Sequence, residues 1–167
     1  MSVSLRLSPV TVFPKSKFFE SCAMPLSPEQ LIERFNARRP PTGILLGMTV
    51  LDVVPEAGRV RLSFSPDARF TNPQGMIQGG IVAAMLDDTA AYAGIVTMGE
   101  AGYITSLEFK TSFFAPAMPG LVYAEGRCLK MGRTACYLEA DLVDEAGKLL
   151  ARMSSTALAI RTARKPK

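Results

Sequence analysis

Apolar and polar residues divide this chain into stretches with helical spacing and stretches with the character of strands. A short helix is predicted to begin after Ser27, which has the character of an N-cap, with Pro28 at the first helical position and Gln30 placed to complete a capping box. The apolar residues that follow form one helical face, and Pro40-Pro41 ends the pattern.

Six stretches have the length and composition of β-strands. The first two, 43–54 and 59–65, are separated by the turn Pro55-Glu56-Ala57-Gly58 and are predicted to form a hairpin. The other four follow a long apolar segment and are separated by segments with good turn chemistry. These four strands are predicted at 103–114, 121–130, 134–143 and 149–160.

The long segment 79–98 is small and apolar on every side, except for Asp87-Asp88 near its midpoint, and Gly99 closes it. As a helix it is about 30 Å long, which is enough to cross a bilayer. Two adjacent carboxylates would be very costly in lipid, so we predict a buried helix and no membrane contact. Six antiparallel strands around this helix give an α+β fold.

A chain of 167 residues with 48% apolar content has the size and composition of one compact domain, which we place at 27–162. Residues 1–26 are a Ser- and Pro-rich extension, and 163–167 are a basic tail. The extension is consistent with a true start at Met24, or with a transit-like or disordered arm. The sequence does not distinguish these alternatives.

The chain contains no histidine, which excludes Ser-His-Asp and Cys-His catalysis. Its three cysteines, Cys22, Cys128 and Cys136, include no Cys-x-x-Cys motif, so we expect no zinc site, no disulfide framework and no cofactor. We expect reduced thiols in a cytoplasmic protein. The net charge of +4 comes from scattered basic residues, which suit an anionic small molecule at least as well as nucleic acid, and no nucleic-acid partner is predicted.

Residues 72–80 read Asn-Pro-Gln-Gly-Met-Ile-Gln-Gly-Gly and are followed by Asp87 in a helix of small residues. This resembles the signature of hotdog-fold acyl-coenzyme A (CoA) thioesterases of the phenylacetic-acid-degradation (PaaI-like) type, Asn-Pro-x-Gly-x-x-His-Gly-Gly followed by Asp or Glu. The resemblance runs from about 43 to 160. It implies a six-stranded antiparallel sheet wrapped around a central helix, hydrolysis of acyl-CoA to acid and CoA, and a homodimer or a homotetramer built from two dimers.

The resemblance assigns the central carboxylate to Asp87, acting either as the base for a water or as a nucleophile. It assigns polarisation of the thioester carbonyl to Gly79, and the backbone N–H groups of Gly79 and Gly80 at a helix start are unpaired and carry the positive end of the helix dipole. Asp88 points about 100° away from Asp87, so we expect it at a subunit contact or an outward face. The leaving thiolate, with a pKa near that of Cys at about 8.5, needs little protonation.

Further positions follow from the same resemblance. Asn72 aligns with an Asn that positions water or substrate, although it also suits a turn before Pro73. Ser106 aligns with a hydroxyl that assists the nucleophile, with Thr105 beside it. Gln78 replaces the histidine of the signature and keeps hydrogen-bonding capacity without titrating. The acyl pocket is predicted to include Met76, Ile77 and Tyr92.

Two other functions compete with hydrolysis. A hotdog domain that binds acyl-CoA without hydrolysing it is favoured by Gln78 in the place of the histidine. A hotdog dehydratase or hydratase resembles a family that relies on a histidine, which this chain lacks.

Overall fold

The computed structural model describes residues 26–99 and 102–162. The N-terminal extension with Cys22 and Met24, and the basic tail, lie outside the described residues. The helices and strands, in chain order, are α1 (Pro28–Ala37), α2 (Pro41–Leu45), β1 (Thr49–Val54), the 3-10 helix η1 (Pro55–Ala57), β2 (Arg59–Phe64), the 3-10 helix η2 (Ala68–Phe70), α3 (Gly79–Thr97), β3 (Gly102–Phe113), β4 (Val122–Met131), β5 (Ala135–Val143) and β6 (Leu149–Arg161).

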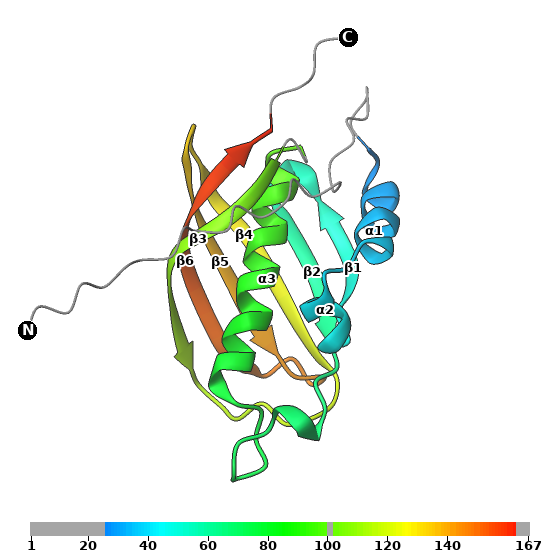
Figure 1. The fold of residues 1–167 in the computed structure, drawn as a ribbon, viewed down its shortest axis with the longest axis vertical. Helices are drawn as coiled ribbons and strands as arrows, with labels where there is room; N and C mark the ends of the chain where they lie inside the picture. The colour runs from blue at the N-terminus through cyan, green and yellow to red at the C-terminus, as the bar shows by residue number, and fades with distance from the viewer. Residues whose placement is uncertain (1–25, 100–101, 163–167) are drawn as a thin grey trace, which may run out of the picture.

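The six strands form one antiparallel sheet in the order β1-β2-β4-β5-β6-β3. The long helix α3 lies across one face of this sheet, while α1 and α2 lie on the side of β1 (Figure 1). This confirms the expected α+β hotdog architecture with its central helix. Strands β1 and β3 are the two edges of the sheet, and β3 is mostly exposed.

The first predicted strand, 43–54, is wrong at its beginning. Residues Pro41–Leu45 form α2, and the strand starts at Thr49. Pro41 lies in the first turn of this helix, where a proline is tolerated, and Gly47 then reverses the chain with a φ of 64°. A short apolar run does not reveal by its periodicity whether it is a helix or a strand. The capping box of α1 at Ser27 and Gln30 is confirmed.

Helix α3 packs closely on the sheet because glycine lies where the two backbones meet. A Cβ on Gly126 of β4 would be 2.4 Å from the carbonyl oxygen of Thr89, so any side chain there would push the helix away. The core between helix and sheet is built from large side chains that are almost completely buried. They include Phe64, Met48, Leu62, Met85, Leu86, Leu138, Leu142 and Met153.

Only one side of α3 is buried, because a single sheet covers one side of a helix. Ala84 is exposed on the open side, and Ala91 and Ile95 are half-buried. By length and composition α3 could cross a membrane, but half of its apolar stretch is buried within the chain, as in the core helix of a globular protein. The predicted buried helix is therefore buried on the face that packs against the sheet, and its other face is left open within a single chain.

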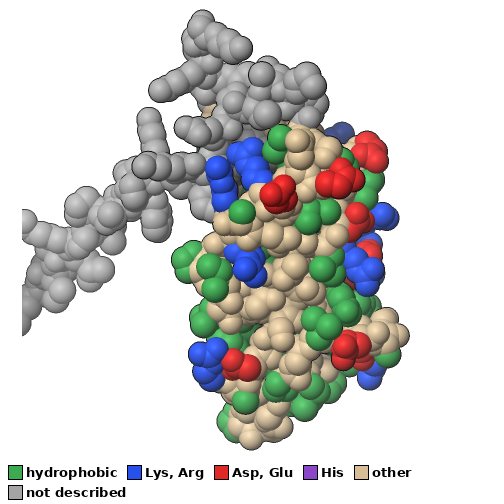
Figure 2. Space-filling model, turned by 90° about the vertical axis from the view of Figure 1, so that its right-hand side faces the viewer, with side chains coloured by type: hydrophobic (Ala, Val, Ile, Leu, Met, Phe, Trp, Pro, Cys, Tyr) green, Lys and Arg blue, Asp and Glu red, His purple; other side chains and the backbone are tan. Residues whose placement is uncertain are grey.

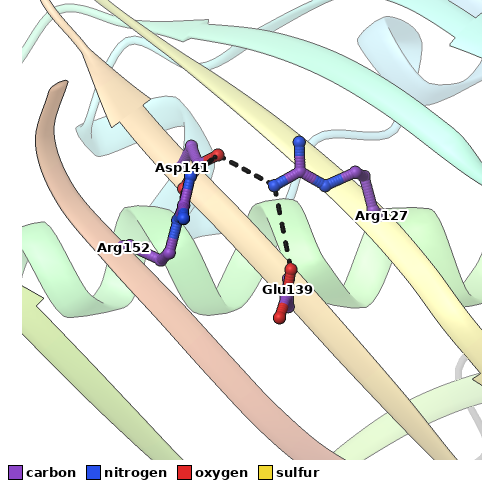
Figure 3. A network of polar contacts seen from close by, with 4 residues as sticks. All are labelled: Arg127, Glu139, Asp141 and Arg152. Carbon is purple, nitrogen blue, oxygen red and sulfur yellow. Dashed lines mark hydrogen bonds and ion pairs between the residues drawn. The ribbon is translucent and has the colours of Figure 1, made fainter. Parts of the chain in front are cut away.

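The opposite face of the sheet carries a network of charges across three strands (Figure 3). Asp141 on β5 accepts hydrogen bonds from Arg127 on β4 at 2.8 Å and from Arg152 on β6 at 2.5 Å. The guanidinium Nη2 of Arg127 also lies 3.8 Å from the carboxylate Oε2 of Glu139. Partial burial acts to raise the pKa of Asp141, but hydrogen bonds from Arg152 and Arg127 outweigh it, and the pKa is lowered. The network therefore ties β4, β5 and β6 together.

The side of the molecule that carries β1 and α1 shows basic, acidic and apolar side chains mixed over its described surface (Figure 2). Toward the upper end of this view, basic side chains and acidic side chains gather in neighbouring groups (Figure 2).

Candidate active site

Asp87 on α3 and Ser106 on β3 meet in the space between these two elements, which is called the groove here. The Ser106 hydroxyl donates to Oδ1 of Asp87 at 2.5 Å, and both residues are half-buried. A β-bulge between Ser106 and Glu108 shifts the pairing of β3 with β6, so that Ser106 pairs with Ala157 and Glu108 with Thr156. Asp87 is therefore held in place by a side chain 19 residues later in the chain.

Asp88 turns away from Ser106, toward Tyr92 one turn later on α3. Burial raises the pKa of Asp88 to about 6, and the neighbouring charge of Asp87 adds to this. Burial raises the pKa of Tyr92 to about 12, and the charge of Asp88 adds to this increase, while the positive charge of Arg39 acts to lower the pKa. Among the described residues no hydrogen bond or ion pair reaches the Asp88 carboxylate.

Asp88 is half-buried within its own chain, and its place at a subunit contact or an outward face stays a prediction. Tyr92 is 8% exposed, and its ring packs edge-on against Phe35 of α1, with the ring centroids 5.0 Å apart. Arg39 donates to the carbonyl oxygens of Asn36 and Met48, which fixes the segment after α1. Phe35 of α1 therefore covers the ring of Tyr92 on this side of α3, a contact that sequence spacing does not reveal.

The first turn of α3 is capped by Gln78. Its side-chain oxygen accepts from the Gly80 N–H at 2.7 Å, so this N–H is occupied within the chain. The Gly79 N–H has no acceptor among the described residues. The ring of Phe113 lies over Gly79, where a Cβ would be 3.3 Å from the ring. Of the two N–H groups predicted to be unpaired at this helix start, only that of Gly79 is left without an acceptor among the described residues.

Asn72 organises the loop that leads into α3. Its side-chain oxygen accepts from the backbone N–H groups of Gln74 and Met76, at 3.0 and 3.2 Å. Its own N–H donates to the carbonyl oxygen of Met76 at 2.7 Å. The backbone N–H of Ile77 donates to Ala117, which fixes the loop against the β3–β4 connection. In this structure Asn72 therefore acts as a turn residue, the second of the two roles considered for it.

The structure does not bring all the predicted pocket residues together. Tyr92 lies 13 residues after Gly79, about 20 Å along the helix, whereas Met76 and Ile77 lie at its start. Ile77 is also buried in the core, at 4% exposure. Thr105 is exposed, and the alternation of the strand turns it to the face opposite Ser106. These four positions therefore do not join Asp87 in one pocket within a single chain.

Two residues of the groove were not among the site residues predicted from the sequence. Phe113 contacts Gly79, and Thr111, two residues earlier on the same face, has a buried hydroxyl with no hydrogen-bond partner among the described residues. Simple alternation would place Ser106 on the face opposite Thr111 and Phe113, and the bulge reverses this. Strand periodicity would have grouped Thr111 with Phe113, but a bulge has no reliable sequence signal.

Other features of the described residues do not add chemistry to this groove. No cluster of three or more acidic, Cys or His side chains suitable for a metal is found in 26–99 and 102–162. Cys128 and Cys136 are free thiols. A shallow cavity of about 360 Å³ lies between the β3–β4 connection and the β5–β6 turn, and none of the predicted site residues lines it.

Comparison with known proteins identifies the family. The Thioesterase superfamily model matches residues 74–151. A phenylacetic acid degradation-related protein of Ralstonia eutropha JMP134 has a similar solved structure, with a TM-score of 0.70 and 30% identity, covering 77% of this chain and 99% of that one. The chain belongs to the thioesterase superfamily.

Two curated thioesterases are similar in sequence. The proofreading thioesterase EntH of Klebsiella pneumoniae is 30% identical over 93 residues, which are 56% of this chain and 68% of that protein. Human acyl-coenzyme A thioesterase 13 is 26% identical over 132 residues, 78% of this chain and 92% of that protein. The matched region of the superfamily contains Asp87, Ser106 and the start of α3, so the groove lies in the part of the chain that is shared with thioesterases.

Proposed function

We propose that this thioesterase hydrolyses an acyl-CoA thioester to a free acid and CoA, with Asp87 as its catalytic carboxylate. The observation that carries the proposal is the Asp87–Ser106 hydrogen bond in a half-buried groove of the central helix. A carboxylate placed inside an apolar helix is usually paired or functional. Ser106 donates to one oxygen only, which leaves Oδ2 of Asp87 free to act.

Asp87 can act in two ways. As a base, it takes a proton from water while the water oxygen attacks the carbonyl carbon, and the thiolate of CoA then leaves from the tetrahedral intermediate. As a nucleophile, its own oxygen attacks the carbonyl carbon, thiolate leaves, and water hydrolyses the mixed anhydride. Both routes suit a chain without histidine, since a thiolate leaves without needing an acid.

The oxyanion donor is the Gly79 N–H, but it belongs to a second copy of the chain. Gly79 and Asp87 are eight residues apart on α3, which is about 12 Å along the axis. One carbonyl group needs its oxygen about 3 Å from a donor and its carbon about 3 Å from the carboxylate. Even with the Asp87 side chain leaning toward the helix start, one chain does not span this geometry.

A two-fold dimer supplies the missing donor. Strand β3 is an unpaired edge with exposed apolar side chains, among them Leu107 at 59% and Phe109 at 47%. The open side of α3 beside it is lined by small residues. Pairing two β3 edges would cover both surfaces and place the start of one α3 near the midpoint of the other. Two such dimers could associate further into a tetramer.

The test of hydrolysis is thiol release from a panel of short, medium, long-chain and aryl acyl-CoA substrates. Asp87→Asn is expected to lower turnover at least about a hundredfold on the substrate that the wild type uses best, with binding largely intact. Asp88→Asn is the matched control and should change turnover much less. Release from no substrate would favour a non-catalytic acyl-CoA-binding protein, and a larger loss at Asp88 would show that Asp87 is the wrong acid.

The test of the shared site is complementation between two inactive variants. Gly79→Pro removes the proposed donor at the first helical position, where the backbone tolerates proline, and Gln78 before it already has an extended conformation. The proline Cβ would lie 3.3 Å from the ring of Phe113, so this exposed ring must shift by a few tenths of an ångström. Mixing this variant with Asp87→Asn at equal amounts makes half of the freely exchanging dimers mixed. Each mixed dimer has one intact site of two, so about one quarter of wild-type activity should return. Subunits that exchange yet regain no activity would place each site within one chain.

A further inference from the structure

One face of β3 connects the catalytic carboxylate to the start of α3. Because of the bulge after Ser106, Ser106 and Phe113 pair with Ala157 and Ala151, which are both buried beneath α3. Ser106 and Phe113 therefore project toward the same helix. Ser106 contacts Asp87 at the helix midpoint, and Phe113 contacts Gly79 at the helix start.

Phe113 lies where a substrate carbonyl would have to enter. The three atoms nearest to a Cβ built on Gly79 all belong to the Phe113 ring, at 3.3, 3.6 and 3.9 Å. Phe113 is nevertheless 56% exposed, so more than half of its surface remains open for contact. A carbonyl oxygen that accepts from the Gly79 N–H would bring its neighbouring carbons against this open ring surface.

We propose that Phe113 is a specificity-determining residue that selects the acyl group by its shape next to the carbonyl. This proposal rests on the proposed thioester hydrolysis and on Gly79 as its oxyanion donor. A single carbon added to Gly79 would already lie 3.3 Å from the ring, so an acyl chain does not fit between Gly79 and Phe113 and must run along the open surface of the ring, where a thin straight chain or a flat group lies flush. A branch on the carbon next to the carbonyl meets the ring. The preferred substrates are therefore acyl-CoA thioesters that are unbranched or flat at this carbon.

The neighbouring residue provides a matched control. Phe114 has the same side chain and 59% exposure, but it lies beyond the end of β3, and it is not among the three nearest contacts of Gly79. Truncating either ring removes little from the core, since both are largely exposed, so both variants should fold. Far-UV circular dichroism and the thermal midpoint check this.

The experiment compares two isomeric substrates on the full-length protein. The substrates are the straight-chain acyl-CoA that the wild type hydrolyses fastest and its isomer branched at the carbon next to the carbonyl. The proposal is supported by three results together. The wild type prefers the straight-chain substrate, Phe113→Ala reduces this preference about tenfold or more, and Phe114→Ala leaves it unchanged. One methyl group in a tight pocket discriminates by about 10- to 200-fold, which sets this scale.

The outcomes separate the two proposals. A wild type that hydrolyses acyl-CoA thioesters but shows the same straight-to-branched ratio as Phe113→Ala overturns the role of Phe113 and leaves the proposed hydrolysis standing. An equal change in Phe114→Ala also overturns it, because the effect would then be general to this end of the strand. No release of thiol from any substrate removes the proposed hydrolysis, and the role of Phe113 with it.

Discussion

Replacing Asp88 by asparagine is expected to stabilise the folded protein at neutral pH and to have little effect at acidic pH. In the folded protein burial raises the pKa of Asp88 from its ordinary value of 3.8 to about 6. The folded state then binds a proton more readily than the unfolded state does. As the pH rises from about 4 to about 6, the folded protein must give up this proton, so wild-type stability falls across that window.

The size of the effect follows from the same two values. The gap between 3.8 and about 6, at about 1.36 kcal/mol per pH unit, corresponds to about 3 kcal/mol of lost stability above pH 6. Relaxation around the charge reduces this, and a buried asparagine still needs hydrogen bonds, so we expect a gain of about 1–3 kcal/mol for Asp88→Asn at pH 8. Below about pH 4 the carboxyl is neutral in both states, and the gain should vanish.

The measurement is urea unfolding of wild type and Asp88→Asn at pH 4, 6 and 8, at one fixed protein concentration because subunit association also affects stability. Glu145→Gln in the exposed turn before β6 is the control for loss of one negative charge. With no histidine in the chain, few other groups titrate near pH 6. A variant less stable than wild type at pH 8, or a gain that does not depend on pH, would falsify this account of a buried, unpaired Asp88 carboxylate.

Three further changes test the groove and the sheet. Ser106→Ala should lower turnover about tenfold through loss of a charge-assisted hydrogen bond, and Ser106→Thr should restore it; an unchanged rate would make the contact incidental. Thr111→Val should leave stability unchanged or raise it by up to about 1 kcal/mol, measured by urea unfolding, whereas a clear loss would reveal a partner for the hydroxyl. Asp141→Asn should lower the free energy of unfolding at pH 7 by about 1–2 kcal/mol. The loss should be smaller at acidic pH, where the wild-type carboxylate also becomes protonated, and an equal loss at both pH values would contradict the lowered pKa.

The local elements could be predicted from the sequence because they depend on short-range patterns, whereas the contact of Asp87 with Ser106 was expected only from the family resemblance. The capping box at Ser27 and the turns between strands are written in neighbouring residues, and five of the six strands were placed to within a residue or two. The spacing from Gly79 to Asp87 identified the helix carboxylate, and the resemblance paired it with Ser106. That contact is present in the structure.

What the sequence by itself determined is therefore the order of the elements and the α+β class, because hydrophobic period and turn chemistry are local properties; the residues that carry the chemistry stay a prediction. Only the tertiary structure decided which way the side chains face. The bulge in β3 put Ser106 and Phe113 on one face, and packing within the chain partly buried Asp88. The 12 Å between Gly79 and Asp87 likewise became a constraint only once both lay on one straight helix. Burial and strand register are set by contacts between residues far apart in the chain, and a single sequence does not encode them in any short pattern.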